Sequence, residues 1–249
     1  MRRVAPAASQ GVRWAGPGAG WLWLAVPLAV LVVTQLSSLR DPLEASRKLT
    51  YSMPSYAPGW TELGRRALMA GDAGLGISAF ERAGELAPDS DDATRGLVEA
   101  YAREGRGVDS LGAFERLEAR GGADGRTLFV AASLLHDSDP TTADEYYVRA
   151  LALEPGNVGV LMNRAGLLAE RGRFQEAHAQ LVVAASHAPK NVMVRFNLGL
   201  VALSLKDPVA AEKAFRAVLE QAPDHRGALR EMSLLRGRSK GPRRSRKGP

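Results

Sequence analysis

The sequence predicts an all-α protein, an α-solenoid of about five helix–turn–helix repeats preceded by one apolar transmembrane helix. Three observations support this prediction. Pro88, Pro155, Pro189 and Pro223 are spaced by 67, 34 and 34 residues, so a unit of about 34 residues recurs along the chain. Ala, Leu, Arg, Glu and Gly dominate the composition, which favours helices. One stretch near the N-terminus is long enough and apolar enough to cross a membrane.

The first element is an apolar segment over residues 18–39, which follows an N-terminal tail of residues 1–17. No charged residue occurs from Trp14 to Leu39, and a helix of this length spans about 30 Å of hydrocarbon. Trp21 and Trp23 lie at one end, where indole rings prefer the lipid headgroups. We therefore expect an uncleaved signal anchor. A cleaved signal peptide and a mitochondrial transit peptide are the alternatives, but the cleavage motif is poor and the apolar run is unlike an amphipathic presequence.

The orientation of this anchor rests on the residues around it. Basic residues stand on both sides, namely Arg2, Arg3 and Arg13 before it and Arg40, Arg47 and Lys48 after it, so their count is nearly balanced. A first helix so near the start usually inserts with its short tail inside. The sequence therefore predicts a single-pass membrane protein with the repeats outside the cytoplasm.

Residues 40–56 are the predicted linker between the anchor and the repeats. Asp41 followed by Pro42 can begin a short helix that runs through Leu49. Two prolines further along favour an extended spacer from Tyr51 to Gly59.

The repeats occupy residues 57–225. Their predicted bounds are 57–90, 91–123, 124–157, 158–191 and 192–225, with Gly122 where the second unit should have its proline. Small residues recur at positions 8, 20 and 27, where they allow two antiparallel helices to approach closely. Asp72, Asp139 and Asp207 all fall at position 16, where the second helix of a unit needs an N-cap. In two of these units a proline follows, at a position that tolerates the missing N–H.

These residues resemble the tetratricopeptide repeat (TPR) family, and with the anchor the chain resembles its membrane-anchored bacterial members, which implies the bacterial inner membrane as its location. The first unit matches the family pattern at Trp60, Leu63, Gly64, Phe80, Ala83 and Pro88, and the fifth at Leu198, Gly199, Ala211, Phe215 and Pro223. The third matches at Ala131, Ala143, Tyr147, Ala150 and Pro155, the fourth at Ala165, Ala177, Ala184 and Pro189, and the second, the weakest, at Leu97, Tyr101 and Phe114. The resemblance implies a solenoid with a concave side. Residues 226–236 fit its terminal capping helix.

The resemblance also implies a partner-binding groove lined by the first helix of each unit. Carried onto this sequence, it comprises Arg95, Arg103, Leu128, Ala132, Leu135, Met162, Asn163, Phe196, Asn197, Leu200 and Leu203, with Arg65 and Glu99 at further groove positions. An apolar groove of this size would be a liability unless a partner covered it. The alternatives are that the apolar side chains pack against the next helix and that the two asparagines satisfy a loop.

The net charge of +6 is concentrated at the two ends of the chain. Residues 1–40 carry +4 and residues 236–249 carry +7, which leaves −5 for residues 41–235. The acidic body argues against nucleic acid as a partner. Residues 237–249 lack the apolar side chains of a core, so we expect a disordered basic tail. Anionic lipid or an envelope polymer is its expected partner, and a solubilising tail without a partner is the alternative.

The residue types argue against an enzyme. There is no cysteine, which excludes thiolate nucleophiles, disulfides and cysteine-ligated metals. The four histidines, His136, His178, His187 and His225, lie on different predicted helices and loops without metal-ligand spacing. No glycine-rich phosphate loop follows a predicted strand. We expect a non-enzymatic protein with no metal and no cofactor.

The sequence therefore favours a membrane-tethered scaffold that binds a peptide or helical segment of a partner protein in its groove and assists assembly of an envelope complex. One alternative is a structural subunit of a larger membrane complex, with its groove permanently covered by a neighbouring subunit. Another is a soluble enzyme regulator released by cleavage.

Overall fold

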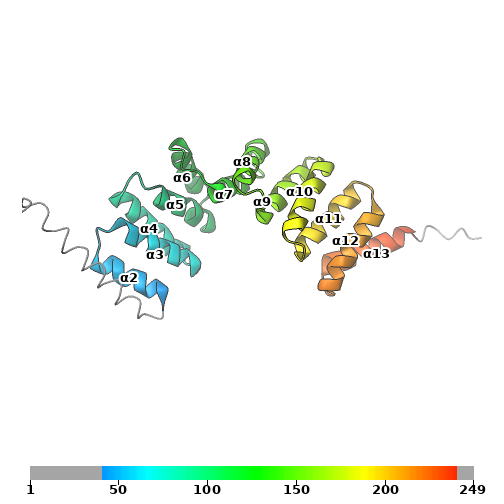
Figure 1. Cartoon of the computed structure of the whole chain (residues 1–249), viewed down its shortest axis with the longest axis horizontal. Coiled ribbons are helices and arrows are strands. Elements are labelled where there is room, and N and C mark those ends of the chain that lie inside the picture. The colour runs from blue at the N-terminus through cyan, green and yellow to red at the C-terminus, as the bar shows by residue number, and fades with distance from the viewer. Residues whose placement is uncertain (1–40, 240–249) are drawn as a thin grey trace, which may run out of the picture. The chain divides into compact units, whose positions relative to one another are not determined.

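The computed structural model describes residues 41–239, and these residues fold into helices without strands (Figure 1). The helices are α2 (Pro42–Ser52), α3 (Ala57–Met69), α4 (Ala73–Leu86), α5 (Asp91–Arg103), α6 (Gly107–Ala119), α7 (Gly125–Leu135), α8 (Pro140–Leu153), α9 (Val158–Glu170), α10 (Phe174–His187), α11 (Val192–Ser204), α12 (Pro208–Gln221) and α13 (Arg226–Ser239). In this part of the chain no helix combines the length and the apolar character that a membrane span needs. The predicted anchor at 18–39, the tail at 1–17 and the basic residues after Ser239 lie outside the described residues.

The helices form two compact units, one up to Asp89 and one from Ser90 onward. In the first unit, α2 packs on α3 and α3 packs on α4. In the second unit, α5 pairs with α6, α7 with α8, α9 with α10, and α11 with α12. Each helix pair corresponds to one predicted repeat, so the described part of the chain is an all-α solenoid as the sequence predicts.

Helix α2 begins at its predicted cap, where the Asp41 carboxylate accepts a hydrogen bond of 2.9 Å from the Leu43 N–H. The helix continues to Ser52, three residues beyond its predicted end. The expected extended spacer from Tyr51 to Gly59 is wrong for most of its length, because the proline after Ala57 lies in the first turn of α3, where proline is tolerated. Only the turn over residues 53–56 separates the two helices.

Aspartate caps begin the second helix in three repeats, as the sequence predicts. The carboxylates of Asp72, Asp139 and Asp207 accept hydrogen bonds of 2.9, 3.1 and 2.9 Å from backbone N–H groups three residues later. Pro140 and Pro208 are the first residues of α8 and α12. Each cap satisfies a backbone donor that the helix itself leaves free, so the second helix starts at the same position of these units.

The residue before the N-cap of the second helix has a left-handed backbone in four repeats. Gly71, Gly105 and Gly172 have φ values of 83°, 77° and 73°, and Lys206 has 61°. All four occupy position 15 of their units. Glycine adopts this conformation without steric cost. In lysine the same conformation is strained, because the Cβ atom lies too close to the backbone.

Small residues allow close pairing of the two helices within a repeat, as predicted. In the third repeat Ala131, Ala143 and Ala150 have no exposed surface, and the Tyr147 side chain is fully buried beside them. Because alanine presents only a methyl group, α7 and α8 can approach until the large ring fills the space between them.

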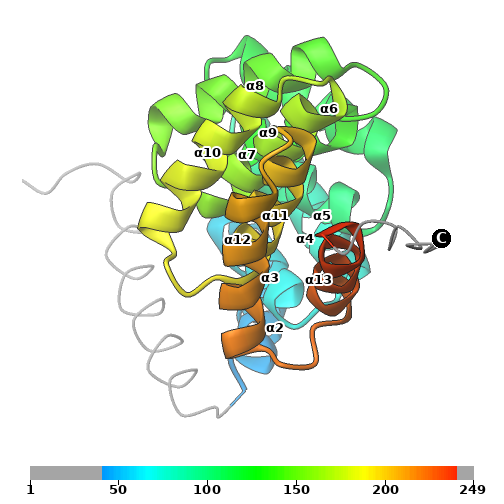
Figure 2. The ribbon, with the colours of Figure 1, turned by 90° about the vertical axis from the view of Figure 1, so that its right-hand side faces the viewer.

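Helix α13 covers the last repeat, next to α12 (Figure 2). Its Ala228 and Met232 are buried in one cluster with Phe215 and Val218 of α12. The sequence predicts a capping helix over residues 226–236, and the helix extends three residues further. Without this cover, the apolar side of α12 would face solvent.

Candidate functional site

A groove of about 670 Å³ lies between α5 and α7, the first helices of the second and third repeats. Its lining residues are Glu99, Ala102, Arg103, Arg126, Phe129, Val130, Ser133, Leu134, Glu154 and Asn157. We call it the α5–α7 groove. It opens where the resemblance to the TPR family places a binding surface, on the first helices of the units.

The α5–α7 groove has an apolar floor and a charged rim. Phe129, Val130 and Leu134 of α7 are half-buried, so each still offers apolar surface to a ligand. Arg103 and Arg126 are exposed beside them. A cleft with apolar walls and a few polar groups suits a protein segment, because the walls supply contact area and the polar groups fix orientation.

Glu99 links the two helices across this rim. Its Oε2 accepts a 2.6 Å hydrogen bond from Nε of Arg126, and its Oε1 accepts hydrogen bonds from both Arg126 and Arg103. Burial raises the pKa of Glu99, but the hydrogen bonds and charges of the two arginines outweigh burial and hold the pKa below its ordinary value. The hydrogen bond to Glu99 raises the pKa of Arg126. The ionised carboxylate therefore orders both guanidinium groups at neutral pH.

A smaller hollow of about 210 Å³ lies between α9 and α11. It is lined by Ala165, Gly166, Ala169, Glu170, Leu181, Asn197, Leu200 and Val201. Asn197 and Leu200 are two of the predicted groove residues, and Leu200 is 37% exposed. Together with Arg103 and Glu99 of the α5–α7 groove, they are the predicted residues that line a hollow on the first helices.

Two predicted groove residues are buried instead. Leu128 is 2% exposed and Ala132 has no exposed surface. Both lie on the side of α7 that packs into the interior of the repeat unit, so their side chains are not available to a partner. For these two, the alternative that apolar residues at groove positions pack within the array is correct.

Three other predicted residues contribute mainly to packing between helices. Phe196 and Leu203 pack against the buried cluster that includes Phe215, and the Phe196 ring lies 4.8 Å from the ring of His225 between centroids. Met162 packs against the two clusters formed by α9, α10 and α11. All three are half-buried, so they stabilise the array whether or not a partner also contacts them.

The remaining predicted residues have polar or peripheral places. The Arg95 guanidinium donates to the carbonyl oxygen of Gly122 through Nε at 3.1 Å and a terminal nitrogen at 2.9 Å. It therefore fixes the end of the second repeat, where glycine replaces proline. The Asn163 amide donates to the Ser133 hydroxyl at 3.4 Å, and Leu135 is the half-buried last residue of α7.

Sequence reasoning missed most of the α5–α7 groove. Arg126, Val130, Ser133 and Leu134 lie outside the groove positions that the resemblance supplies. One signal was present: Phe129 occupies position 6 of its unit, the position that holds asparagine in the next two units. An aromatic residue at a position expected to face a ligand indicates an apolar floor.

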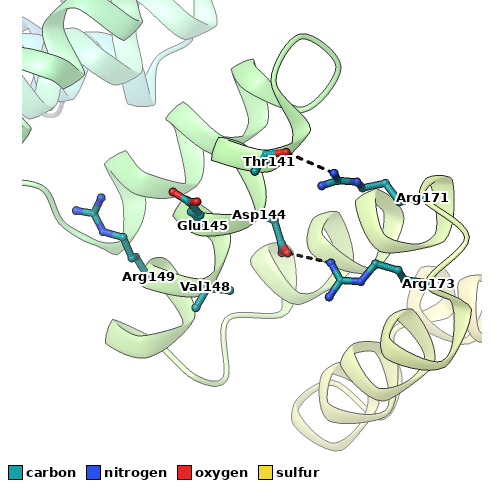
Figure 3. A pocket seen from close by; sticks show the side chains of 7 residues that line it. All are labelled: Thr141, Asp144, Glu145, Val148, Arg149, Arg171 and Arg173. Atoms are coloured by element: carbon teal, nitrogen blue, oxygen red, sulfur yellow. Dashed lines mark hydrogen bonds and ion pairs between the residues drawn. The ribbon is translucent and has the colours of Figure 1, made fainter.

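A further hollow of about 770 Å³ lies beside α8 (Figure 3). In it, Asp144 faces Arg173 at 3.3 Å, and Thr141 faces Arg171 at 3.4 Å. Asp144 also accepts a 2.6 Å hydrogen bond from Arg164 of α9. Because these charged groups already bind one another across two repeats, the hollow is better explained as a polar junction than as a ligand site.

Three possible metal ligands also meet where α7 and α9 end. His136, Asp137 and Glu170 bring ligand atoms within 4.8 Å of one another. The sequence argument found no metal-ligand spacing around the histidines because 34 residues separate His136 from Glu170. That separation is one repeat, so the two residues occupy position 13 of successive units. An alignment of the repeats would therefore have predicted that they lie close together.

Comparison with known proteins matches these repeats. A tetratricopeptide repeat model matches residues 61–125 and 170–226, and a second such model matches residues 134–195. The type IV pilus assembly protein PilF of Pseudomonas aeruginosa (strain PAO1) is 36% identical over 101 residues, which are 40% of this chain and 40% of PilF. The match thus spans about two fifths of the length of that relative.

Solved structures share the architecture. PilW, described as a widely conserved type IV pilus biogenesis factor, matches with a TM-score of 0.68 and 14% identity over 88% of this chain and 99% of the PilW chain. YrrB, described as a TPR protein with an unusual peptide-binding site, matches with a TM-score of 0.64 and 19% identity over 77% of this chain and 99% of its own. At these identities the likeness shows the fold alone. The helix pairs, their register and the matching repeat models together show that this chain belongs to the tetratricopeptide repeat family.

Proposed function

We propose that this protein is an interaction scaffold that holds a segment of a partner protein in the α5–α7 groove while an envelope complex is assembled. The observation that carries the proposal is the apolar floor of Phe129, Val130 and Leu134 beside a rim ordered by Glu99. A ligand segment would cover the floor with apolar side chains, which gives affinity, and would meet the rim with polar groups, which gives orientation. The chemistry of the groove is that of binding, consistent with a non-enzymatic protein.

Polar groups at the mouth of the groove favour a segment that presents its backbone. The Ser133 side chain is exposed there, and the Asn157 amide donates to Glu154 at 2.8 Å while keeping further hydrogen-bonding capacity. Groups of this kind can bond peptide N–H and C=O groups whatever the side chains are. We infer an extended or one-sided helical segment, with apolar residues spaced to reach α7.

The relatives suggest which complex is served. The 36% identity to PilF over 101 residues supports type IV pilus assembly as the process. The likeness to PilW supports the suitability of the fold and does not by itself identify a partner. We therefore propose that the bound segment belongs to a component of a pilus or a related envelope machine.

Membrane tethering is part of the proposal. The uncharged stretch at residues 18–39 has the length and composition of a transmembrane anchor. With the anchor in the inner membrane and the repeats outside the cytoplasm, the groove would face envelope proteins. A reporter enzyme active only outside the cytoplasm, fused after residue 249, would be active in this orientation and inactive in the opposite one.

Site-specific crosslinking tests the groove. A photoreactive amino acid at Ser133, in the groove, should capture a defined partner in membranes, whereas the same group at exposed Ser186 on α10 serves as the control. Phe129→Glu should then abolish the Ser133 crosslink without loss of helical circular dichroism. Identical crosslinked products from Ser133 and Ser186, or a Ser133 crosslink that survives Phe129→Glu, would show that the groove does not bind the partner.

A permanent structural subunit is the second candidate function, and exposed apolar side chains on α8 and α10 favour it. Val148 and Leu153 are 45% and 59% exposed, and Val182 and Val183 are 48% and 40% exposed. A neighbouring subunit would remove these surfaces from water. A stable complex of fixed stoichiometry after detergent extraction supports this candidate, and a salt-labile, substoichiometric one supports the scaffold.

A further inference from the structure

His136, Asp137 and Glu170 gather at the C-terminal ends of α7 and α9, outside the α5–α7 groove. Their ligand atoms lie within 4.8 Å of one another, and Nε2 of His136 lies 3.1 Å from Oε2 of Glu170. Two ligands bound to one tetrahedral zinc ion at about 2.0 Å each are roughly 3.3 Å apart. The imidazole and the Glu170 carboxylate thus already have the separation of two ligands of one ion.

The His136 ring is held on its other side. Its Nδ1 lies 3.4 Å from the Tyr147 hydroxyl. That hydroxyl is 3.5 Å from Ser133 Oγ, which accepts the amide hydrogen bond of Asn163. When Nδ1–H donates to the Tyr147 oxygen, the lone pair of Nε2 points to the carboxylates. A partner on the second nitrogen that fixes ring and tautomer is the usual arrangement around a metal-binding histidine.

The charge balance at this place favours a cation. Among residues 41–239, Glu170 pairs with no lysine or arginine and approaches only the His136 ring, and Asp137 pairs with no basic side chain. The adjacent Arg171 bonds instead to the carbonyl of Pro140 and the hydroxyl of Thr141.

We propose that His136, Asp137 and Glu170 bind a divalent transition-metal ion, of which zinc fits best, and that the ion joins the third and fourth repeats. One imidazole nitrogen with two carboxylate oxygens suits zinc, whereas calcium and magnesium prefer oxygen ligands throughout. Water completes the coordination. Position 13 holds Arg103 in the second repeat and Ser204 in the fifth, so neither of those units offers an imidazole or a carboxylate there.

Zinc titration of the full chain tests the proposal. The protein is purified in detergent without a polyhistidine tag, treated with EDTA and titrated with ZnCl₂ by calorimetry, with MgCl₂ and CaCl₂ for comparison. We expect one zinc ion per chain and a thermal unfolding midpoint that rises with zinc concentration. Glu170→Gln, which keeps the shape of the side chain but removes its charge, and His136→Gln should each weaken zinc binding more than about tenfold.

His178→Gln is the matched control, because His178 lies on α10 outside the cluster and should leave zinc affinity unchanged. If His136→Gln lowers the helical circular dichroism, Glu170→Gln and Asp137→Asn decide the question, since both side chains are exposed. The proposal is overturned if zinc leaves the midpoint unchanged or if these variants bind zinc as tightly as the native chain. Loss of binding in His178→Gln alone would place the ion elsewhere and would overturn it as well.

Discussion

A Cβ atom added to Gly199 of α11 would lie 2.4 Å from Cε1 of the Phe215 ring on α12. The ring therefore occupies the space that any other residue at position 199 would need. Gly64 and Phe80 repeat the relationship in the first repeat, with a distance of 2.8 Å. Phe215 has no exposed surface, so its ring has no empty volume into which it can move.

Gly199→Ala should lower the free energy of unfolding by about 1–3 kcal/mol, because the added methyl group overpacks a full core. Urea denaturation followed by circular dichroism measures the change. Gly166→Ala is the control, since a Cβ on this helical glycine meets nothing within 4 Å, and it should stabilise the protein by about 0.5–1 kcal/mol.

A second change should partly rescue Gly199→Ala. The fourth repeat has Ala165 and Leu181 at the positions that Gly199 and Phe215 occupy in the fifth. Gly199→Ala combined with Phe215→Leu should therefore lose less stability than the two single changes together. Strict additivity in this double-mutant cycle would show that the glycine and the ring are not coupled.

Asp144→Asn should destabilise the protein by about 2 kcal/mol, because it leaves arginines of the next repeat without their carboxylate. Asp144 and Arg164 have side chains that are only 18% and 16% exposed, at 2.6 Å from each other. Glu145→Gln, in the exposed part of the same hollow, is the control and should change stability by less than about 0.5 kcal/mol. Equal effects of the two substitutions would argue against this ion pair as the important contact.

Glu99→Gln should lower stability by about 1 kcal/mol at neutral pH, and the loss should disappear in acid. The Glu99 pKa is lower in the folded protein than in the unfolded chain, where it is about 4.3. The carboxylate therefore stabilises the fold above that unfolded value, and this contribution is lost as the pH falls through the lower folded value. Denaturation at several pH values should show the native and Gln chains converging below about pH 4.3. A constant difference would contradict the assignment.

Gly172→Ala should cost about 1 kcal/mol, although a Cβ there meets no atom within 4 Å, because φ is +73°. Lys206 occupies the same repeat position with φ of 61°, so Lys206→Gly should be neutral or slightly stabilising. The two changes of midpoint in thermal unfolding should thus have different signs or very different sizes. A large loss from Lys206→Gly would mean that the lysine side chain makes a contact more valuable than the backbone strain.

The fold could be predicted from the sequence because the same residue types recur at the same positions of the repeats, where they begin, pair and end the helices. Asp72, Asp139 and Asp207 cap helices wherever the register places them, since capping depends on atoms only three residues away. The turn before α3 was predicted less well. There, proline was interpreted as a feature of an extended spacer although the first turn of a helix accepts it equally.

The groove was harder to predict because its surface depends on contacts between repeats. Leu128 lies at a groove position by register but is buried by the packing of its own unit. Phe129, one residue later, lines the α5–α7 groove instead. Which of these two adjacent residues faces the groove depends on how α7 is rotated about its axis. Side chains of the neighbouring repeats decide that rotation, so the sequence of one unit cannot predict it. The contact between His136 and Glu170 could likewise be predicted only by aligning two successive units, because the two residues occupy the same position in each.

The repeats of the second compact unit are joined in series, so any pulling force along them passes through every joint in turn. Asp144 and its two arginines place ion pairs at the joint between the third and fourth repeats, where Leu151 also packs against the next repeat. Leu168 and Val201 make the following joint apolar. Salt screens the more exposed Asp144–Arg173 pair of the first joint, and it does not screen the apolar contacts of the second. Ionic strength would therefore change the resistance of the first joint to tension more than that of the second.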